Sequence, residues 1–224
     1  DINNPVSWAS KAKQLKASAI ALRITGIKEK NRSSKDIVEI AKNIIDQTQL
    51  PLCILGLNNR ELDRKFLPSI AEGLAGLNCL VGPIEEETYK YIVPACRDAG
   101  HCVIARSPID INLAKQLNIL ITELGFDPGK IIIDPNLGGL GYGLDYAYSV
   151  VEKIRLAAFE GDQMLNMPIL VFSGEEAWRT KEAKTSINDN IWGNHAERAA
   201  MWEILTTSSM LSVGVDLVVM RYPD

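Results

Sequence analysis

Two aspartates and a glycine-rich loop are the residues of this sequence whose types and spacing could support chemistry. Asp134 ends a short β-branched run, and the loop from Asn136 to Gly143 (NLGGLGYG) follows it almost at once. Because glycine has no Cβ, such a loop allows its backbone to approach a bulky ligand closely. A long turn that needs positive φ at several positions would use the same glycines, so both interpretations stay open.

Asp110 and Asp134 could act as a general acid–base pair. Alternatively, Asp110 caps the helix that follows it, and Asp134 accepts hydrogen bonds from backbone N–H groups of the next loop. The two histidines, His101 and His195, have no carboxylate partner at a strand end, so no Ser-His-Asp set is recognisable. We therefore expect no catalytic residue on this chain.

The four cysteines indicate structural roles. None belongs to a C-x-x-C pair, and Cys53 and Cys79 lie inside apolar runs, where cysteine behaves as a small hydrophobic residue. We expect all four to be reduced and the protein to be cytoplasmic. Neither histidine has a partner at metal-ligand spacing, so we expect no metal site and no iron–sulfur cluster on this chain.

Composition limits the class of protein and its partners. The 224 residues are 46% hydrophobic and 23% charged, which is typical of a globular protein and sufficient for one large domain over residues 1–224. A net charge of −4 argues against nucleic acid or an anionic membrane as the main partner. No apolar run is long enough to cross a bilayer, and no segment resembles a signal peptide.

The elements that must position these residues alternate along the chain. A helix is predicted first, over 3–16, with Asn4 as its cap and Pro5 in its first turn. Helix-spaced apolar residues separate the predicted strands, and the polar stretch 181–194 predicts a long irregular connection flanked by Trp178 and Trp192. The predicted buried strands cover residues 19–25, 51–57, 78–82, 101–107, 130–134, 167–173 and 215–220.

Two helix predictions are specific enough to be checked residue by residue. Thr88 is expected to cap a helix that begins at Tyr89. In the helix over 197–210, the side chains of Trp202, Leu205 and Met210 are expected to face the core. The two tryptophans beside the polar connection could form a contact surface or lie buried beneath a loop.

Buried strands that alternate with helices predict an α/β fold with an all-parallel sheet. The spacing favours a TIM (β/α)₈-type barrel that lacks its first strand and its last helix in this chain. An open doubly wound sheet is the alternative, and the absence of G-x-G-x-x-G after the first strand argues against it. Because an incomplete barrel would expose strand edges, we expect a fragment of a longer chain or a further segment that completes the barrel.

Several segments of the chain together carry a family resemblance, and the loop with Leu-Gly-Tyr-Gly after Asp134-Pro135 is the most specific of them. The segments are residues 108–118, 133–135, 138–143, 148–150, 154–158, 177–184, 192–193, 201–203 and 216–221, which cover nearly the whole chain. In these segments the sequence resembles a known family, the small subunits of corrinoid iron–sulfur proteins, equivalent to the delta subunit of the acetyl-CoA decarbonylase/synthase complex. One departure is Asn136-Leu137, where the family usually has two threonines.

The resemblance implies a non-catalytic TIM barrel that forms a heterodimer with a larger subunit, which carries an iron–sulfur cluster and most of the cobalamin site. The cobalt of that cobalamin (corrinoid) receives a methyl group from methyltetrahydrofolate through a methyltransferase. It passes the group to acetyl-CoA synthase in the anaerobic acetyl-CoA (Wood–Ljungdahl) pathway of one-carbon metabolism, where carbon monoxide dehydrogenase/acetyl-CoA synthase acts. We hypothesise that the corrinoid lies against Asn136, Gly138, Gly139, Leu140, Gly141, Tyr142 and Gly143.

Two other functions stay open. A pterin-binding barrel could itself transfer methyl from methyltetrahydrofolate to a corrinoid protein, with amides and carboxylates at strand ends recognising the pterin. A purely structural barrel could hold a complex together and contact no cofactor. The residues that could form the pterin site are Asn58, Asp110, Asn112, Asp134 and Asn136.

Overall fold

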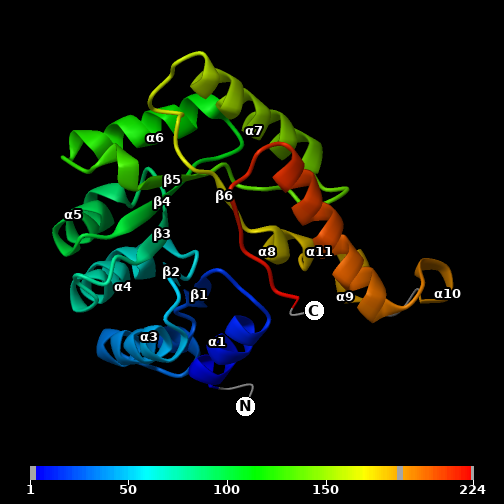
Figure 1. Cartoon of the computed structure of the whole chain (residues 1–224), viewed down its shortest axis with the longest axis horizontal. Helices are drawn as coiled ribbons and strands as arrows, with labels where there is room; N and C mark the ends of the chain where they lie inside the picture. Colours follow the sequence, from blue (N-terminus) through cyan, green and yellow to red (C-terminus); the bar gives the residue numbers. More distant parts are fainter. Residues whose placement is uncertain (1–3, 186–188, 223–224) are drawn as a thin grey trace. The chain divides into compact units, whose positions relative to one another are not determined.

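The chain forms two compact units. The computed structural model describes residues 4–185 and 189–222. Unit 1 comprises Asp1–Ala105 and Leu117–Ile131, and unit 2 comprises Arg106–Gln116 and Ile132–Asp224. The boundary therefore passes through three elements of the chain, β4 (Cys102–Arg106), α6 (Ile111–Glu123) and β5 (Ile131–Asp134), which Figure 1 labels.

Unit 1 is built on parallel strands that pair in sequence order. Ile20 of β1 pairs with Leu52 of β2, Val81 of β3 pairs with Ile54 of β2, and the next pairing joins β3 to β4. Since all these strands run the same way, their carboxyl ends lie at one edge of the sheet. The strands are β1 (Ile20–Arg23), β2 (Leu52–Leu55), β3 (Leu80–Ile84) and β4 (Cys102–Arg106), the last residue of which belongs to unit 2.

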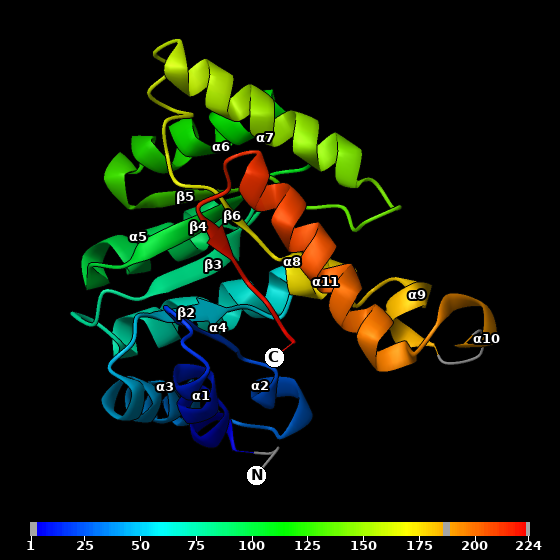
Figure 2. The same cartoon turned by 45° about the vertical axis from the view of Figure 1, so that its right-hand side comes forward.

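Helices connect these strands, and α3, α4 and α5 lie next to one another in sequence order on the same side of them (Figures 1 and 2). Local signals set where the helices begin: Asn4 accepts a hydrogen bond from Val6 N at 2.9 Å, and Ser33 forms a capping box with Asp36. The helices are α1 (Pro5–Gln14), α2 (Gly26–Glu29), α3 (Ser34–Thr48), α4 (Arg60–Gly73) and α5 (Tyr89–Ala99).

Thr88 occupies the predicted position before α5, but its side chain does not cap the helix. Its hydroxyl accepts a hydrogen bond from Glu85 N at 2.9 Å and donates to Glu85 O at 3.1 Å. The prediction of a side-chain cap was therefore wrong. The hydroxyl instead bonds within the tight turn that precedes the helix, where Glu85 supplies both a donor and an acceptor.

The core of unit 1 lies between the strands and their helices. All four residues of β2 are buried, as are Leu67 of α4 and Ile92 of α5. Burial of a side chain of this size contributes about 1.5 to 3 kcal/mol relative to an exposed one. The apolar, β-branched runs recognised in the sequence therefore form strands because both of their faces are covered.

Three elements follow β4. Asp110 caps the first of them, because its carboxylate accepts hydrogen bonds from Asn112 N at 2.7 Å and Leu113 N at 3.1 Å. Gly125, with φ of 76°, follows the end of the same helical segment. The elements are α6 (Ile111–Glu123), the 3₁₀ turn η1 (Pro128–Lys130) and β5 (Ile131–Asp134).

Unit 2 also contains strands that pair in parallel. Ser107 N donates to Asp134 O at 3.1 Å, and Ile133 N donates to Pro168 O at 2.8 Å, which places the end of β5 between these two segments. Next, β6 (Leu170–Val171) pairs in parallel with β7 (Leu217–Val218). The predicted strand 167–173 is thus shorter than expected, because residues from Ser173 onward form a helix.

Helix α11 is the central helix of unit 2 and contacts α7, α8 and α9 (Figures 1 and 2). It buries Glu203 and Met210, whereas Leu205, predicted to face inward, is 45% exposed. The helices are α7 (Leu144–Phe159), α8 (Ser173–Ala177), α9 (Lys181–Lys184), α10 (Asp189–Trp192) and α11 (His195–Ser212). The stretch 181–194, predicted to be irregular, therefore contains two single-turn helices; its residues 186–188 lie outside the described residues.

No helix in the described part of the chain combines the length and the apolar character needed to cross a membrane.

Candidate functional site

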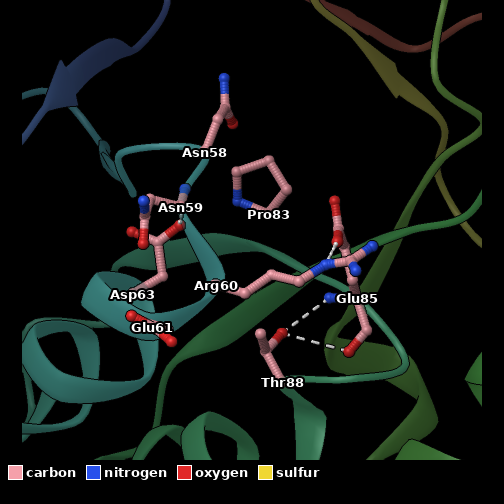
Figure 3. A pocket seen from close by; sticks show the side chains of 8 residues that line it. All are labelled: Asn58, Asn59, Arg60, Glu61, Asp63, Pro83, Glu85 and Thr88. Atoms are coloured by element: carbon pink, nitrogen blue, oxygen red, sulfur yellow. Dashed lines mark hydrogen bonds and ion pairs between the residues drawn. The ribbon is translucent and has the colours of Figure 1, made fainter.

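The strand ends of unit 1 form a polar pocket. Asn58, with φ of 54°, and Asn59 follow β2, whereas Pro83 and Glu85 lie at the end of β3 and just beyond it. Figure 3 shows Arg60 extending towards Glu85, with Thr88 beside that residue. The pocket has a volume of about 460 Å³ and is lined by Asn58, Asn59, Arg60, Glu61, Asp63, Pro83, Glu85 and Thr88.

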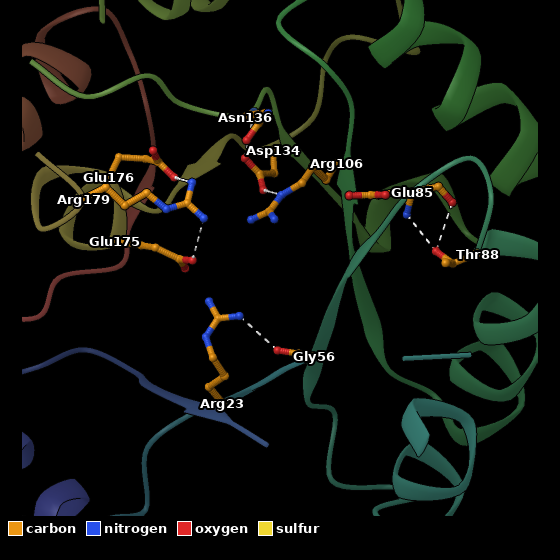
Figure 4. A network of polar contacts seen from close by, with 10 residues as sticks. All are labelled: Arg23, Gly56, Glu85, Thr88, Arg106, Asp134, Asn136, Glu175, Glu176 and Arg179. Carbon is orange, nitrogen blue, oxygen red and sulfur yellow. Dashed lines mark hydrogen bonds and ion pairs between the residues drawn. The ribbon is translucent and has the colours of Figure 1, made fainter. Parts of the chain in front are cut away.

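In unit 2, Asp134 stands at the end of β5 and is completely buried. One carboxylate oxygen accepts a hydrogen bond from Arg106 Nε at 2.6 Å, and the other accepts from Asn136 N at 3.0 Å (Figure 4). The guanidinium of Arg106 also lies 4.9 Å from the ring centre of Phe172. The alternative in which Asp134 accepts from the next loop is therefore confirmed, with an ion pair added.

Burial dominates the electrostatics of Asp134. Loss of water raises the pKa of its carboxyl group, while the charge and hydrogen bond of Arg106 and the N–H of Asn136 oppose that rise. The guanidinium compensates for the cost of burying the carboxylate. Because Asp110 caps α6, both aspartates of the suggested acid–base pair have structural partners.

A second charged cluster follows β6 (Figure 4). Arg179 Nη1 lies 2.6 Å from Glu176, and Nη2 lies 3.5 Å from Glu175. The pKa of Glu176 is raised chiefly by burial, which the nearby Arg179 opposes. The cluster therefore pairs the two glutamates of the short helix α8 with a cation that follows it.

The glycines of the loop 136–143 serve two different purposes. A Cβ on Gly138 would come within 2.7 Å of the backbone of Gly143, and one on Gly139 would come within 3.1 Å of Glu176 O. These two glycines therefore allow the loop to fold against itself and against α8. Gly141 differs, because its Cβ position is open and its φ is 75°.

A tight turn holds the outer part of this loop. Tyr142 N donates to Gly139 O at 2.9 Å, with Gly141 at the third turn position, where a positive φ is required in a type II turn. The hydroxyl of Tyr142 donates to Glu182 of α9, at 3.2 Å from Oε2. Asn136, Gly141 and Tyr142 are exposed, Gly138, Leu140 and Gly143 are half-buried, and Gly139 is buried.

Arg198 of α11, which the sequence did not single out, anchors the connection 181–194. It is 8% exposed, and its guanidinium donates to the carbonyl oxygens of Glu182, Thr185 and Gly193. It also lies 5.5 Å from the ring centre of Trp192. Nothing in the local pattern indicated this role, because the carbonyl partners precede the helix that carries the arginine.

Glu203 was also missed, although it joins three segments. The carboxylate is completely buried and accepts hydrogen bonds from Trp178 Nε1 and Arg221 N, both at 2.6 Å, and from Tyr222 N at 3.2 Å. Gly174 permits this arrangement, because a Cβ there would come within 2.6 Å of Arg221 N. Trp178 is thus half-buried beneath this cluster, whereas Trp192 is 37% exposed.

The cysteines lie mostly in the interior of the protein. All four cysteines are free thiols; Cys53, Cys79 and Cys96 are buried, and burial raises the pKa of Cys79 to about 11 and that of Cys96 to about 12. Cys102 is partly exposed. Among the described residues, no group of three or more His, Cys, Asp or Glu side chains is arranged to hold a metal ion.

Comparison of sequences identifies a family. A family model described as the CO dehydrogenase/acetyl-CoA synthase delta subunit matches residues 2–224. The acetyl-CoA decarbonylase/synthase complex subunit delta of Methanocaldococcus jannaschii is 32% identical over 231 residues, which cover 99% of this chain and 55% of that protein. Subunit delta 1 of Methanosarcina thermophila is 31% identical over 232 residues, covering 99% and 53%. The chain spans about half the length of these curated relatives.

Comparison of structures identifies the fold. Dihydropteroate synthase from Xanthomonas albilineans superposes with a TM-score of 0.66 at 13% identity, over 97% of this chain and 79% of that one. The enzyme from Thermus thermophilus superposes with a TM-score of 0.64 at 14% identity, over 99% and 84%. These likenesses show an α/β fold of the TIM-barrel type, as the alternation of strands and helices predicted.

Proposed function

Because the chain belongs to the CO dehydrogenase/acetyl-CoA synthase delta-subunit family, we propose that it is a non-catalytic subunit of a corrinoid iron–sulfur methyl carrier. It forms a heterodimer with a larger subunit that holds the cobalamin and the iron–sulfur cluster. It helps to enclose the cobalamin while a methyl group passes from methyltetrahydrofolate, through a methyltransferase, to acetyl-CoA synthase. Methyltransferase and synthase are transient partners.

The observation that carries this proposal is the shape of the loop 136–143. The space beside its inner glycines, Gly138 and Gly139, is occupied by the protein's own backbone. In contrast, Asn136, Gly141 and Tyr142 are exposed, and the space at the Cβ position of Gly141 is open. A flat macrocycle could approach the backbone there, because no side chain stands in the way. The fit therefore favours the outer residues as the contact and gives Gly138 and Gly139 the task of shaping the loop.

Cobalamin, when bound, supplies a cobalt that accepts and releases the methyl group. The loop contributes the protein side of that chemistry, since residues 136–143 carry no charged side chain and can exclude water. The hydrogen bond between Tyr142 and Glu182, together with the clamp of Arg198 on the carbonyl of Glu182, keeps the loop in place.

The structural roles of the two candidate acids, Asp110 and Asp134, support a non-catalytic function. Asp110 caps α6, and Asp134 is buried against Arg106. A general acid or base must reach the proton that it transfers, so a carboxylate held in a buried ion pair is poorly placed for that task.

The test compares two tyrosines of matched exposure in the full-length protein, purified with its natural partners. Tyr142 is 56% exposed and Tyr91 of α5 is 57% exposed. The complex should show a corrinoid absorbance band only when the larger chain is present. Tyr142→Ala should speed the oxidation of the reduced cobalt severalfold by admitting solvent, and Tyr91→Ala should not.

Three results would count against the proposal. One is a corrinoid band carried by this chain without a partner, and another is methyl turnover by this chain alone. The third concerns the contact itself: a structure of the heterodimer with cobalamin more than about 10 Å from every atom of residues 136–143 is inconsistent with the carbon-to-carbon contacts of roughly 4 Å that packing requires.

A pterin-binding methyltransferase is the alternative function. The likeness to dihydropteroate synthases establishes a shared fold, and a fold does not determine a function. Titration of the protein with methyltetrahydrofolate separates the two functions, because micromolar binding would favour the methyltransferase. A cytoplasmic location and a barrel without its first strand and last helix stay predictions.

A further inference from the structure

The pocket of unit 1 has no part in the proposed corrinoid contact, and three observations about it point to a ligand. The first is its place. It lies where β2 and β3 lead into α4 and α5, at the carboxyl ends of parallel strands, where open and closed α/β sheets bind small molecules. Its volume of about 460 Å³ is within the range of small-molecule sites.

The second observation is that hydrogen bonds hold the walls of the pocket (Figure 3). The buried carboxylate of Asp63 accepts from Leu57 N at 2.6 Å and from Asn59 N at 3.1 Å, which fixes the loop after β2. Asn59 in turn caps α4 by accepting from Leu62 N at 3.1 Å. The pocket is therefore preformed and does not depend on a ligand to order it.

Arg60 connects the loop after β2 to the opposite wall of the pocket, which follows β3. Its Nε lies 2.8 Å from Glu85, and its Nη1 lies 2.9 Å from Glu87. Thr88 fixes the turn of Glu85 through two hydrogen bonds. The two loops are thus joined across the pocket, and the positive charge of Arg60 is matched by two glutamates.

The third observation is the chemistry of the lining. Glu61, Asp63 and Glu85 contribute three carboxylates, whereas Arg60 is the lining cation and is engaged by Glu85 and Glu87. A carboxylate offers about four acceptor positions, so Asp63 retains acceptor capacity after receiving two N–H groups. No metal-holding group occurs among the described residues, and Pro83 adds an apolar wall.

We infer that this pocket binds a small organic cation that carries several N–H donors, of the amidinium or guanidinium class. Such a group can bond a carboxylate through two parallel N–H donors, which a metal ion or a simple ammonium cannot do. The apolar face of Pro83 suits the planar body of such a ligand. The inference is independent of the corrinoid role.

The test uses benzamidine and benzamide, which have nearly the same shape but differ in charge and in the number of donors. Isothermal titration of the full-length protein should show saturable binding of benzamidine and at least about tenfold weaker binding of benzamide. Glu61→Gln should weaken benzamidine binding about fivefold. Glu86→Gln, an equal charge change at an exposed glutamate outside the pocket lining, should leave it unchanged.

The inference is overturned by equal binding of the two compounds, by no binding of benzamidine, or by an unaltered affinity in Glu61→Gln. An equal loss in both glutamate variants would also overturn it, since that result indicates a diffuse attraction to negative surface charge. Glu61 is exposed, so its replacement should preserve the fold, which the thermal midpoint verifies.

Discussion

A single buried imidazole shows how one residue couples stability to pH. His101 is completely buried; its Nδ1 accepts a hydrogen bond from Cys79 N at 3.1 Å, and its Nε2 lies 2.9 Å from Ala71 O. Because Nδ1 accepts, the ring proton is on Nε2 and is donated to Ala71 O. A second proton, on Nδ1, would point directly at the N–H group of Cys79. Burial, together with the charge of Lys130, accordingly lowers the pKa of His101.

This arrangement predicts a loss of stability in mild acid. The unfolded chain takes up a proton at His101 near pH 6.5, whereas the folded chain resists it, so the His101 contribution is complete above about pH 6.5 and declines below it. Urea unfolding at pH 7.5 and 5.5 should show the stability advantage of the natural protein over His101→Gln shrinking by up to about 1.4 kcal/mol per pH unit. A constant difference would contradict the neutral assignment.

The ion pair between Arg106 and Asp134 should contribute to the stability of the folded protein. Asp134→Asn should lower the free energy of unfolding by about 3 kcal/mol, because a nearly buried guanidinium loses its counter-charge. The double variant Arg106→Gln/Asp134→Asn should lose less than the sum of the two single changes. Chemical denaturation measures all three variants.

Lys115 and Asp162 provide the control for that measurement. Their ion pair is more exposed, with 45% of the lysine side chain and 22% of the aspartate side chain accessible. Lys115→Met should therefore cost less than about 1 kcal/mol. Equal costs at the two pairs would show that burial does not determine the strength of the Arg106–Asp134 interaction.

At the scale of secondary-structure elements, Glu203 links α8, α11 and the segment after β7. Glu203→Gln should lower the free energy of unfolding by about 2 kcal/mol, because an amide replaces a charged acceptor of three N–H groups. The backbone amides of Arg221 and Tyr222 should exchange with solvent faster, which hydrogen-exchange mass spectrometry can detect. Glu197→Gln, in the exposed first turn of α11, should alter neither quantity appreciably.

The elements also show which parts of the fold could be predicted. Asn4, Ser33-Asp36 and Asp110 mark helix starts because a cap and its N–H partners lie within three residues of each other. The failure at Thr88 had a local cause, the turn at Glu85, but others arose where partners are distant in the sequence. The turns α9 and α10 are held by Arg198, and Gly174, at the start of α8, donates to Val219 O. No window of neighbouring residues contains that information.

At the scale of the whole molecule, the expectation of one domain over residues 1–224 can be tested by unfolding. Trp8 belongs to unit 1, whereas Trp178, Trp192 and Trp202 belong to unit 2. Tryptophan fluorescence therefore reports mainly on unit 2, while far-ultraviolet circular dichroism reports on helices of both. A single domain should give coincident urea transitions by the two probes. Separate midpoints would indicate that the two units unfold independently.

The amino-acid sequence by itself determined the alternation of buried strands and helices, several helix starts and the family, because these depend on local spacing and on contiguous motifs. It also brought Asp110, Asp134 and the loop 136–143 to attention. Tertiary structure alone decided what they do. Asp134 pairs with Arg106, 28 residues away. The space beside Gly138 and Gly139 is occupied by backbone atoms of the loop and of α8. The physical reason is burial: the state of a carboxylate and the space beside a glycine are set by whatever folding places next to them.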